Sequence, residues 1–173
     1  RHDTDYPLAE GRIVSDGGLD IPVDEVEHHF AEEHRPQSTA LFSLLNGEPY
    51  LVGPLARLNL NADRLPASSL ALLEKSGIPF PSNNMFLSLY ARALEIHVAI
   101  VEAIRLLENY RLPSAPHTEV TARTGVGYGA TEAPRGLLWH RYEVDDQGLI
   151  KSARIVPPTS QNQARIEVDL HRS

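Results

Sequence analysis

The sequence predicts an α+β fold that forms one unit over residues 1–173. Three observations favour this class. The stretch from Asn84 to Tyr110 has the periodicity of a long helix, and pairs of short apolar runs flank turn residues typical of β-hairpins. No internal repeat or low-complexity linker divides the chain, and its length is enough for one hydrophobic core.

Turn residues predict three hairpins, because glycine and asparagine adopt the positive φ that tight turns require. The strands and turns that we expect are 11–15 with 19–22 around Asp16-Gly17-Gly18, 38–45 with 48–55 around Asn46-Gly47, and 137–144 with 149–156 around Asp145–Gly148. A weak strand is also expected at Thr118–Arg123. The sequence therefore predicts a set of short antiparallel pairs.

Shorter helices are expected beside these hairpins. Val23–His34 carries apolar residues on one face and ends before Pro36. Pro66–Lys75 begins with proline and is followed by Gly77, the residue typical of a helix end. The segment from Thr159 to Leu170 is polar and is either helical or extended.

The helix expected from Asn84 to Tyr110 is roughly 40 Å long and carries two apolar stripes. The first contains Phe86, Leu89, Ala93, Ile96, Ile100, Ile104 and Leu107, and the second contains Leu87, Leu94, Val98 and Val101. A helix that is apolar on two sides is normally buried between layers. We expect one side to be buried within the chain and the other to remain exposed, or to be covered in a dimer.

Composition restricts the functional classes. The net charge of −7 argues against a nucleic-acid partner, and no apolar run reaches the roughly 18 residues of a membrane span. The polar start, Arg1–Asp5, lacks a signal-peptide core and an initiator Met, as expected for an internal segment. The chain has no cysteine, which excludes a thiolate nucleophile or a thiolate metal site within it.

The glycine-rich run from Gly125 to Gly136 places one guanidinium, that of Arg135, on a turn restricted by Pro134. A fixed arginine can bind an anion or a polar ligand with little loss of entropy. The alternative is an arginine that only closes its turn by binding carbonyl groups. A nucleotide-binding loop is disfavoured, because the run leads into no helix and Pro134 interrupts it.

Histidines and acidic residues provide weaker candidates. His29 and Glu33 have the spacing of a shared metal site, but with His28 and His34 they are more simply explained as a solvated helix face. His140 is either a proton carrier or a structural residue behind the Arg135 turn.

Three further polar residues are given no catalytic role. Glu132 is expected to pair with Arg135 or to cap the turn. Arg57 and Asn59 are expected to be turn and interface residues.

Three long motifs resemble the large subunits of nickel–iron hydrogenases. They are Tyr50-Leu-Val-Gly-Pro-Leu-Ala-Arg-Leu-Asn59, Glu132-Ala-Pro-Arg-Gly-Leu-Leu-Trp-His-Arg-Tyr-Glu143 and Ile155-Val-Pro-Pro-Thr-Ser-Gln-Asn162. The resemblance covers most of the chain and is strongest at 49–60 and 125–163. It points to the cytoplasmic branch of the family, which passes electrons to deazaflavin, nicotinamide or heterodisulfide partners.

The resemblance implies reversible oxidation of H2, with electrons passed first to an iron–sulfur small subunit, then to acceptor subunits. The family's Ni–Fe(CN)2(CO) centre is held by two Cys-x-x-Cys pairs, one near each end of the large subunit. Neither pair occurs among these residues. We therefore expect a central fragment, inactive alone and without metal, that belongs to a cytoplasmic enzyme and is able to self-associate.

The resemblance also assigns site residues. Arg135 matches the arginine over the open side of the nickel and iron, and Pro134 lies beside it. Many members have a Ser or Thr that donates to an iron-bound cyanide where this chain has Pro158. Thr159, the next residue, or a backbone N–H is the expected replacement. The family's proton-relay glutamate lies outside the chain.

Two other classes of protein compete with the hydrogenase. The quinone-pocket subunit of respiratory NADH:quinone oxidoreductase shares the scaffold without the metals, but it has lysine and an acidic residue in place of Arg135 and Leu137. A scaffold or interaction module that never bound metal is the third class. Cys-x-x-Cys motifs in the flanking gene sequence would distinguish a hydrogenase from both.

Overall fold

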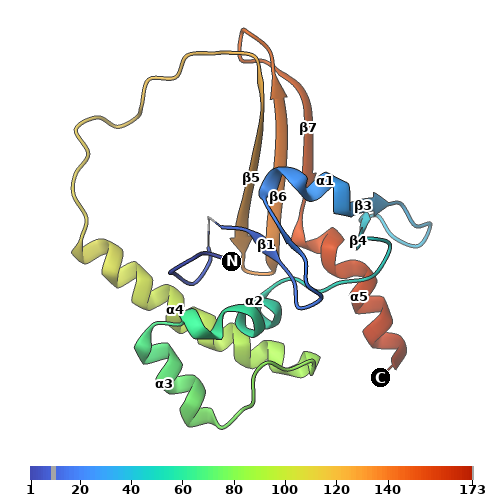
Figure 1. The fold of residues 1–173 in the computed structure, drawn as a ribbon, viewed down its shortest axis with the longest axis vertical. Coiled ribbons are helices and arrows are strands. Elements are labelled where there is room, and N and C mark those ends of the chain that lie inside the picture. The colour runs from blue at the N-terminus through green and yellow to red at the C-terminus, as the bar shows by residue number, and fades with distance from the viewer. Residues whose placement is uncertain (9–10, 173) are drawn as a thin grey trace.

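The computed structural model describes residues 1–8 and 11–172, and its elements confirm the α+β class. The three-stranded sheet lies above the helices of residues 54–108, and the carboxyl-terminal helix α5 (Pro158–Arg172) extends downward from the sheet on the other side (Figure 1). Within the described residues, no helix combines the length and apolar character that a bilayer crossing requires.

The sheet is an antiparallel meander in the order β5-β6-β7. The strands are β5 (Gly125–Ala133), β6 (Gly136–Val144) and β7 (Ile150–Val156). The predicted third hairpin is therefore confirmed, and the glycine-rich run before it adds a strand. Ala133 pairs with Gly136, so that Pro134 and Arg135 alone form the tip of the β5–β6 hairpin.

The first predicted hairpin is confirmed, and the second has the right turn but the wrong partner. In the first, β1 (Ile13–Val14) pairs with β2 (Asp20–Ile21). In the second, Asn46 and Gly47 turn the chain with φ values of 50° and 85°. However, β4 (Phe42–Leu45) pairs with β3 (Phe30–Glu33), and within the expected second strand the isolated bridge that the structure shows joins Glu48 to Leu45.

Proline explains why the segment 48–55 is no strand. Pro54 lacks the N–H that a ladder needs and suits the first turn of a helix, which is where it lies in α2 (Pro54–Asn61). α2 continues into the 3₁₀ turn η2 (Ala62–Arg64).

The helix predicted over 23–34 is wrong in its second half. It consists of a 3₁₀ turn η1 (Val23–Glu25) and one turn of α1 (Val26–His29), after which the chain becomes β3. Pairing with β4 buries Phe30, whose ring meets that of Tyr50 edge-on at 5.2 Å. This tertiary contact outweighs the local helical pattern.

The remaining helices are as expected, and one predicted strand is wrong. These helices are α3 (Ala67–Ser76), η3 (Met85–Leu87) with α4 (Ser88–Glu108), and α5 (Pro158–Arg172). Helix α3 ends at Gly77, which has φ 67°. The segment Thr159–Leu170, expected to be helical or extended, is therefore helical. Thr118–Arg123 is not a strand but an exposed connector, because it pairs with no other strand of the described residues.

The core consists of two apolar clusters, one on either side of the β5–β6 tip. The first joins α2, α3 and α4 through Tyr6, Leu58, Leu65, Leu73, Ala91, Leu94 and Val98. The second joins β6 and β7 to the amino-terminal segments through Ile21, Val26, Phe30, Trp139 and Val156. The Trp139 indole, 1% exposed, donates to the Val23 carbonyl at 2.8 Å, which ties the sheet to η1.

Helix α4 buries one apolar face and exposes the other, as predicted. The buried side is the second stripe: Leu94 and Val98 are in the core, and Val101 is half-buried. The exposed large side chains of the first stripe are Phe86, Leu89, Ile96, Ile100, Ile104 and Leu107, each at least 51% exposed. The exposed stripe is therefore long and continuous.

Candidate functional site

The tip of the β5–β6 hairpin presents Arg135 to solvent while holding its backbone in place. The Arg135 side chain is exposed, and its guanidinium has no hydrogen-bond or ion-pair partner in residues 1–8 and 11–172. Its carbonyl oxygen accepts a hydrogen bond from Asn162 Nδ2 on α5 at 3.1 Å. The same asparagine accepts at Oδ1 from the Val52 N–H at 2.9 Å, so it bridges three segments.

Two glycines allow the close packing that places this tip. Gly53 has φ 113°, and a Cβ there would lie 2.7 Å from the Arg135 carbonyl oxygen. Gly136 has φ 142°, and a Cβ there would overlap the side chain of Val52 and lie 3.1 Å from Pro158 Cβ. Any larger residue at either position would therefore displace the tip.

The structure brings the predicted site residues into one neighbourhood. Pro134 and Arg135 form the tip, and Pro158, the first residue of α5, packs against Gly136 directly after it. Thr159 follows in the first turn of α5, where its own side chain is exposed. The tip and the start of α5 are thus neighbours, although Pro158 lies 22 positions after Gly136 in the chain.

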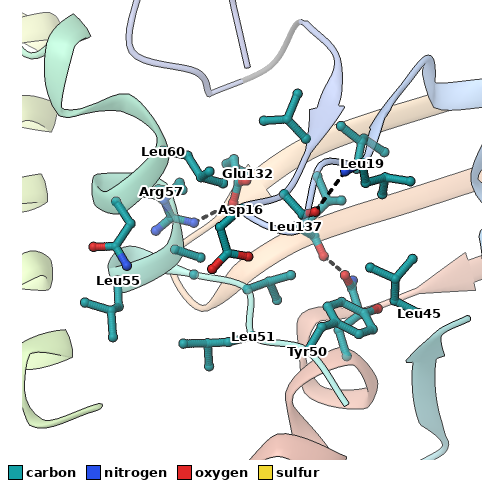
Figure 2. A pocket seen from close by; sticks show the side chains of 18 of the residues that line it. Asp16, Leu19, Leu45, Tyr50, Leu51, Leu55, Arg57, Leu60, Glu132 and Leu137 are labelled. Atoms are coloured by element: carbon teal, nitrogen blue, oxygen red, sulfur yellow. Dashed lines mark hydrogen bonds and ion pairs between the residues drawn. The ribbon is translucent and has the colours of Figure 1, made fainter. Parts of the chain in front are cut away.

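Arg57 holds the hairpin tip from the opposite side, and the sequence did not reveal this role. All five N–H groups of its guanidinium donate. Nε and Nη2 reach Glu95 at 2.7 and 2.6 Å, and Nη1 reaches Glu132 at 2.5 Å. The remaining two bonds go to the carbonyls of Ala133 at 2.9 Å and Pro134 at 3.3 Å. Figure 2 shows Arg57 pointing from α2 towards Glu132 on the sheet.

Glu132 therefore pairs with Arg57 and not with Arg135, which corrects the expectation from the sequence. The partners Glu95 and Glu132 lie 38 and 75 residues after Arg57, so local spacing carried no signal of the pairing. Tyr6 completes the cluster by donating from its hydroxyl to Glu95 at 2.7 Å. We call Tyr6, Arg57, Glu95 and Glu132 the Arg57 cluster.

The Arg57 cluster is a buried arrangement of two carboxylates around one cation. The side chains of Arg57, Glu95 and Glu132 are only 7%, 15% and 19% exposed. Burial alone would lower the pKa of Arg57, but the hydrogen bonds and charges of both glutamates raise it above its ordinary value. For Glu132, burial outweighs the attraction of Arg57, and its pKa is raised. Burial and the charge of Glu95 likewise raise the pKa of the Tyr6 hydroxyl.

The raised pKa of Glu132 predicts a pH dependence of stability. A group whose pKa is higher in the folded protein stabilises the fold most when it is protonated, below its unfolded value of about 4.3. That contribution is lost as the pH rises from about 4.3 through the raised pKa of the folded state. In Glu132→Gln, the unfolding free energy should therefore fall less with rising pH across this window than it does in the unaltered chain.

Urea unfolding at a series of pH values from 4 upward, in steps of about half a pH unit, measures this difference. Glu143→Gln is a matched control, because Glu143 also lies on the sheet but its side chain is 37% exposed. Parallel curves for the unaltered chain and Glu132→Gln would contradict the prediction.

A cavity of about 850 Å³ adjoins the Arg57 cluster. Arg57 and Glu132 lie in its wall beside apolar residues, which include Leu51, Leu55, Leu60 and Leu137 (Figure 2). Val52 and Gly53, which pack under the hairpin tip, also line it, whereas Arg135 does not. The size falls within the range of small-molecule sites, and further polar residues of the wall include Asp16, Asn61 and Gln161.

The histidine candidates form no metal site in the structure. His29 ends α1 and Glu33 lies on β3, so the helical spacing that would bring them together does not exist. Across the described residues, no group of three or more His, Asp or Glu side chains is arranged to hold a metal ion. His140 Nδ1 lies 2.8 Å from the Tyr142 hydroxyl, an arrangement that supports the structural interpretation.

Asn59 has a role close to the one predicted for it, whereas Arg57 does not. Asn59 bridges to Ser82, donating to its carbonyl at 2.9 Å and accepting from its N–H at 3.0 Å, as a loop-fixing residue does. Arg57 is a buried residue that links α2, α4 and the hairpin. Its arrangement can orient the tip but offers no nucleophile.

Comparison with known proteins shows similarity to hydrogenases along nearly the whole chain. It is 33% identical over 164 residues, 94% of its length, to the alpha subunit of sulfhydrogenase 1 from Pyrococcus furiosus, and this match covers 38% of that protein. It is 34% identical over 125 residues, 68% of its length, to a vhu subunit of the F420-non-reducing hydrogenase from Methanococcus voltae, 29% of which is covered. No protein-family model matches.

Comparison with solved structures also finds hydrogenases. An NAD+-reducing [NiFe]-hydrogenase in the H2-reduced state superposes with a TM-score of 0.71 and 29% identity, covering 96% of this chain and 40% of that one. A [NiFeSe] hydrogenase from Desulfovibrio vulgaris Hildenborough superposes with a TM-score of 0.54 and 22% identity over 83% of this chain and 37% of that one, which supports the fold alone.

The fold and these relatives define the chain as a homologue of hydrogenase subunits, a class of oxidoreductases. More particularly, it belongs with the large subunits of nickel–iron hydrogenases, of which it represents a part. It spans 38% and 29% of the length of the two relatives named above.

Proposed function

We propose that this chain is the central part of the catalytic subunit of a nickel–iron hydrogenase, which oxidises H2 reversibly to protons and electrons. The electrons pass first to an iron–sulfur small subunit, then to acceptor subunits, in an enzyme of the cytoplasmic branch. The observation that carries the proposal is the rigidly held hairpin tip with its free Arg135, in a chain that matches hydrogenases over 94% of its length.

The residues of the chain do not fit a nickel–iron centre by themselves. Such a centre takes thiolate ligands in this family, and the chain has no cysteine. The described residues also contain no cluster of other metal-ligating side chains. The ligands of the whole subunit would have to come from other segments, and the role of this chain is to place residues beside them.

Arg135 is the residue to which we assign a catalytic role. Heterolytic cleavage of H2 separates charge, and a fixed guanidinium in a site of low dielectric constant stabilises such separation. The tip supports this role, because its backbone is held while its side chain has no competing partner among the described residues. Pro134 restricts the backbone directly before Arg135.

Pro158 and Thr159 are assigned a supporting role beside Arg135. Pro158 packs against Gly136 and so fixes the distance between α5 and the tip. Thr159 is exposed in the first turn of α5, where its hydroxyl can donate to a neighbouring polar ligand. This hydroxyl replaces the Ser or Thr that the resemblance led us to expect at position 158.

The hydrogenase function is tested in the full-length subunit once it is assembled with its small subunit. We expect reduction of a viologen dye that depends on H2. A metal-replete assembly that neither reduces the dye with H2 nor evolves H2 from the reduced dye would exclude the hydrogenase function. Activity towards quinones without H2 would support the competing quinone-pocket subunit.

The isolated 173-residue chain should contain no stoichiometric nickel or iron. The physical reason is the absence of thiolates, which are the ligands that hold these metals in the family. Elemental analysis of the purified chain measures this. About one nickel per chain, lost in His29→Ala, would contradict the prediction and restore a histidine site.

The isolated chain should also self-associate through the exposed stripe of α4 that contains Ile96, Ile100 and Ile104. A contiguous apolar stripe of this length is uncommon on a monomeric surface. Ile100→Glu should shift the chain towards monomer in sedimentation velocity, whereas Gln147→Glu adds the same charge in the exposed β6–β7 turn and should not. A chain that is monomeric across a concentration series would show that the stripe drives no association.

A further inference from the structure

We infer that Asn162 is a positioning residue for Arg135. The inference rests on the proposed function, because Arg135 is the group on which it acts. Asn162 lies one turn into α5, outside the hairpin, and no part of its side chain needs to contact a substrate. Its amide group touches the Arg135 main chain at one atom and the Val52 main chain at the other.

Side chains from two helices bind the carbonyl groups of the hairpin tip. The carbonyls of Ala133 and Pro134 accept from Arg57, and the carbonyl of Arg135 accepts from Asn162. Three successive carbonyls are thus bound by side chains from α2 and α5. Because β5 and β6 pair only up to Ala133 and Gly136, the strand ladder itself does not restrain these peptide planes.

The two residues that hold the tip, Arg57 and Asn162, differ in what else they support. Arg57 also joins Glu95 and Glu132 in the buried cluster, so its removal disturbs the fold itself. Asn162 is half-buried, and among the described residues its side chain makes two hydrogen bonds, both to the backbone. It is therefore the residue whose loss reports on the orientation of Arg135 with the least effect on the core.

The peptide bond after Arg135 connects the Asn162 amide to the position of the Arg135 side chain. The Arg135 carbonyl belongs to the peptide plane between Arg135 and Gly136, and rotation of that plane changes ψ of Arg135. The backbone sets the point from which the Arg135 side chain extends, so a change in this peptide plane shifts the region that the guanidinium can reach. A shift of about 1 Å at a reacting group is enough to lower a rate by up to about a hundredfold.

Asn162→Asp tests this with a change of one atom. The carboxylate keeps an acceptor for the Val52 N–H, but it loses the donor to the Arg135 carbonyl and places a negative oxygen against it. Asn59→Asp is the matched control, because the Asn59 amide also donates to one backbone carbonyl and accepts from one backbone N–H, both of Ser82. Both variants are made in the full-length enzyme, assembled from the large and small subunits.

We expect Asn162→Asp to lower kcat for H2 oxidation about tenfold with KM unchanged, and Asn59→Asp to leave both near the unaltered values. Amide hydrogen exchange of the peptide 131–138 should rise in Asn162→Asp only. In a double variant, Arg135→Lys with Asn162→Asp should turn over as slowly as Arg135→Lys alone, because one residue acts through the other.

Two results would overturn the inference and leave the proposed function intact. One is an additive loss of rate in the double variant, and the other is equal kcat and equal hydrogen exchange for Asn162→Asp and Asn59→Asp. An unaltered, metal-replete enzyme that does not oxidise H2 would overturn the function and, with it, the role of Asn162.

Discussion

Arg135→Lys in the full-length, assembled enzyme should lower the rate of H2 oxidation by at least about a hundredfold, which corresponds to about 3 kcal/mol of transition-state stabilisation. Lysine keeps the charge but replaces a planar guanidinium by a flexible ammonium, so the charge is no longer held in one place. The substitution should not alter the fold, because the Arg135 side chain is exposed and has no partner within the described residues.

Steady-state kinetics, elemental analysis and urea unfolding together decide this prediction. Metal content should equal that of the unaltered enzyme, and the unfolding free energy of the chain should change by less than about 0.5 kcal/mol. Arg154→Lys is a matched control on the same sheet, since Arg154 pairs with Glu27 and Glu32 away from the tip. A metal-replete Arg135→Lys enzyme with near-unaltered turnover would exclude a catalytic role.

A variant that loses activity because the chain no longer folds would also count against the catalytic role. It would support the interpretation in which Arg135 only closes its turn. The structure disfavours that interpretation, because the carbonyls of the tip already accept from Arg57 and Asn162.

Arg57→Leu should destabilise the chain by about 3–5 kcal/mol, the largest effect that we expect on stability. It removes the only cation of the Arg57 cluster and leaves Glu95 and Glu132 buried together without it. It also removes the donors to the carbonyls of Ala133 and Pro134. A buried carboxylate that loses its partner costs more than the net gain of the original pair.

Urea unfolding measures the loss, and two further variants identify its cause. Arg57→Leu combined with Glu95→Gln and Glu132→Gln should recover a large part of the stability, because no unpaired charge remains. Arg12→Ala breaks an ion pair with Asp20 that is more than half exposed at both ends, so it should have a much smaller effect. A loss in Arg57→Leu as small as that in Arg12→Ala would show that the cluster contributes little.

The sequence alone determined the features that depend on local chemistry. Helix α4 follows from its periodicity, α3 from Pro66 and Gly77, and the turn at Asn46-Gly47 from the positive φ that both residues tolerate. The family resemblance came from three long motifs, and those motifs supplied the site residues Pro134, Arg135, Pro158 and Thr159. The roles assigned to these residues stay predictions.

Tertiary structure decided the features that depend on segments distant in the sequence. Phe30–Glu33 became a strand because β4 offered it hydrogen bonds and a buried place for Phe30. Periodicity could not show which stripe of α4 would be buried, since both stripes are apolar and only packing on α2 and α3 distinguishes them. The sequence predicted Arg57 to be a turn or interface residue, but the fold brings Glu95 and Glu132, 38 and 75 residues away, within hydrogen-bond distance of it. Long-range pairing of buried charges leaves no local pattern, because each partner is specified by the fold and not by its neighbours in the chain.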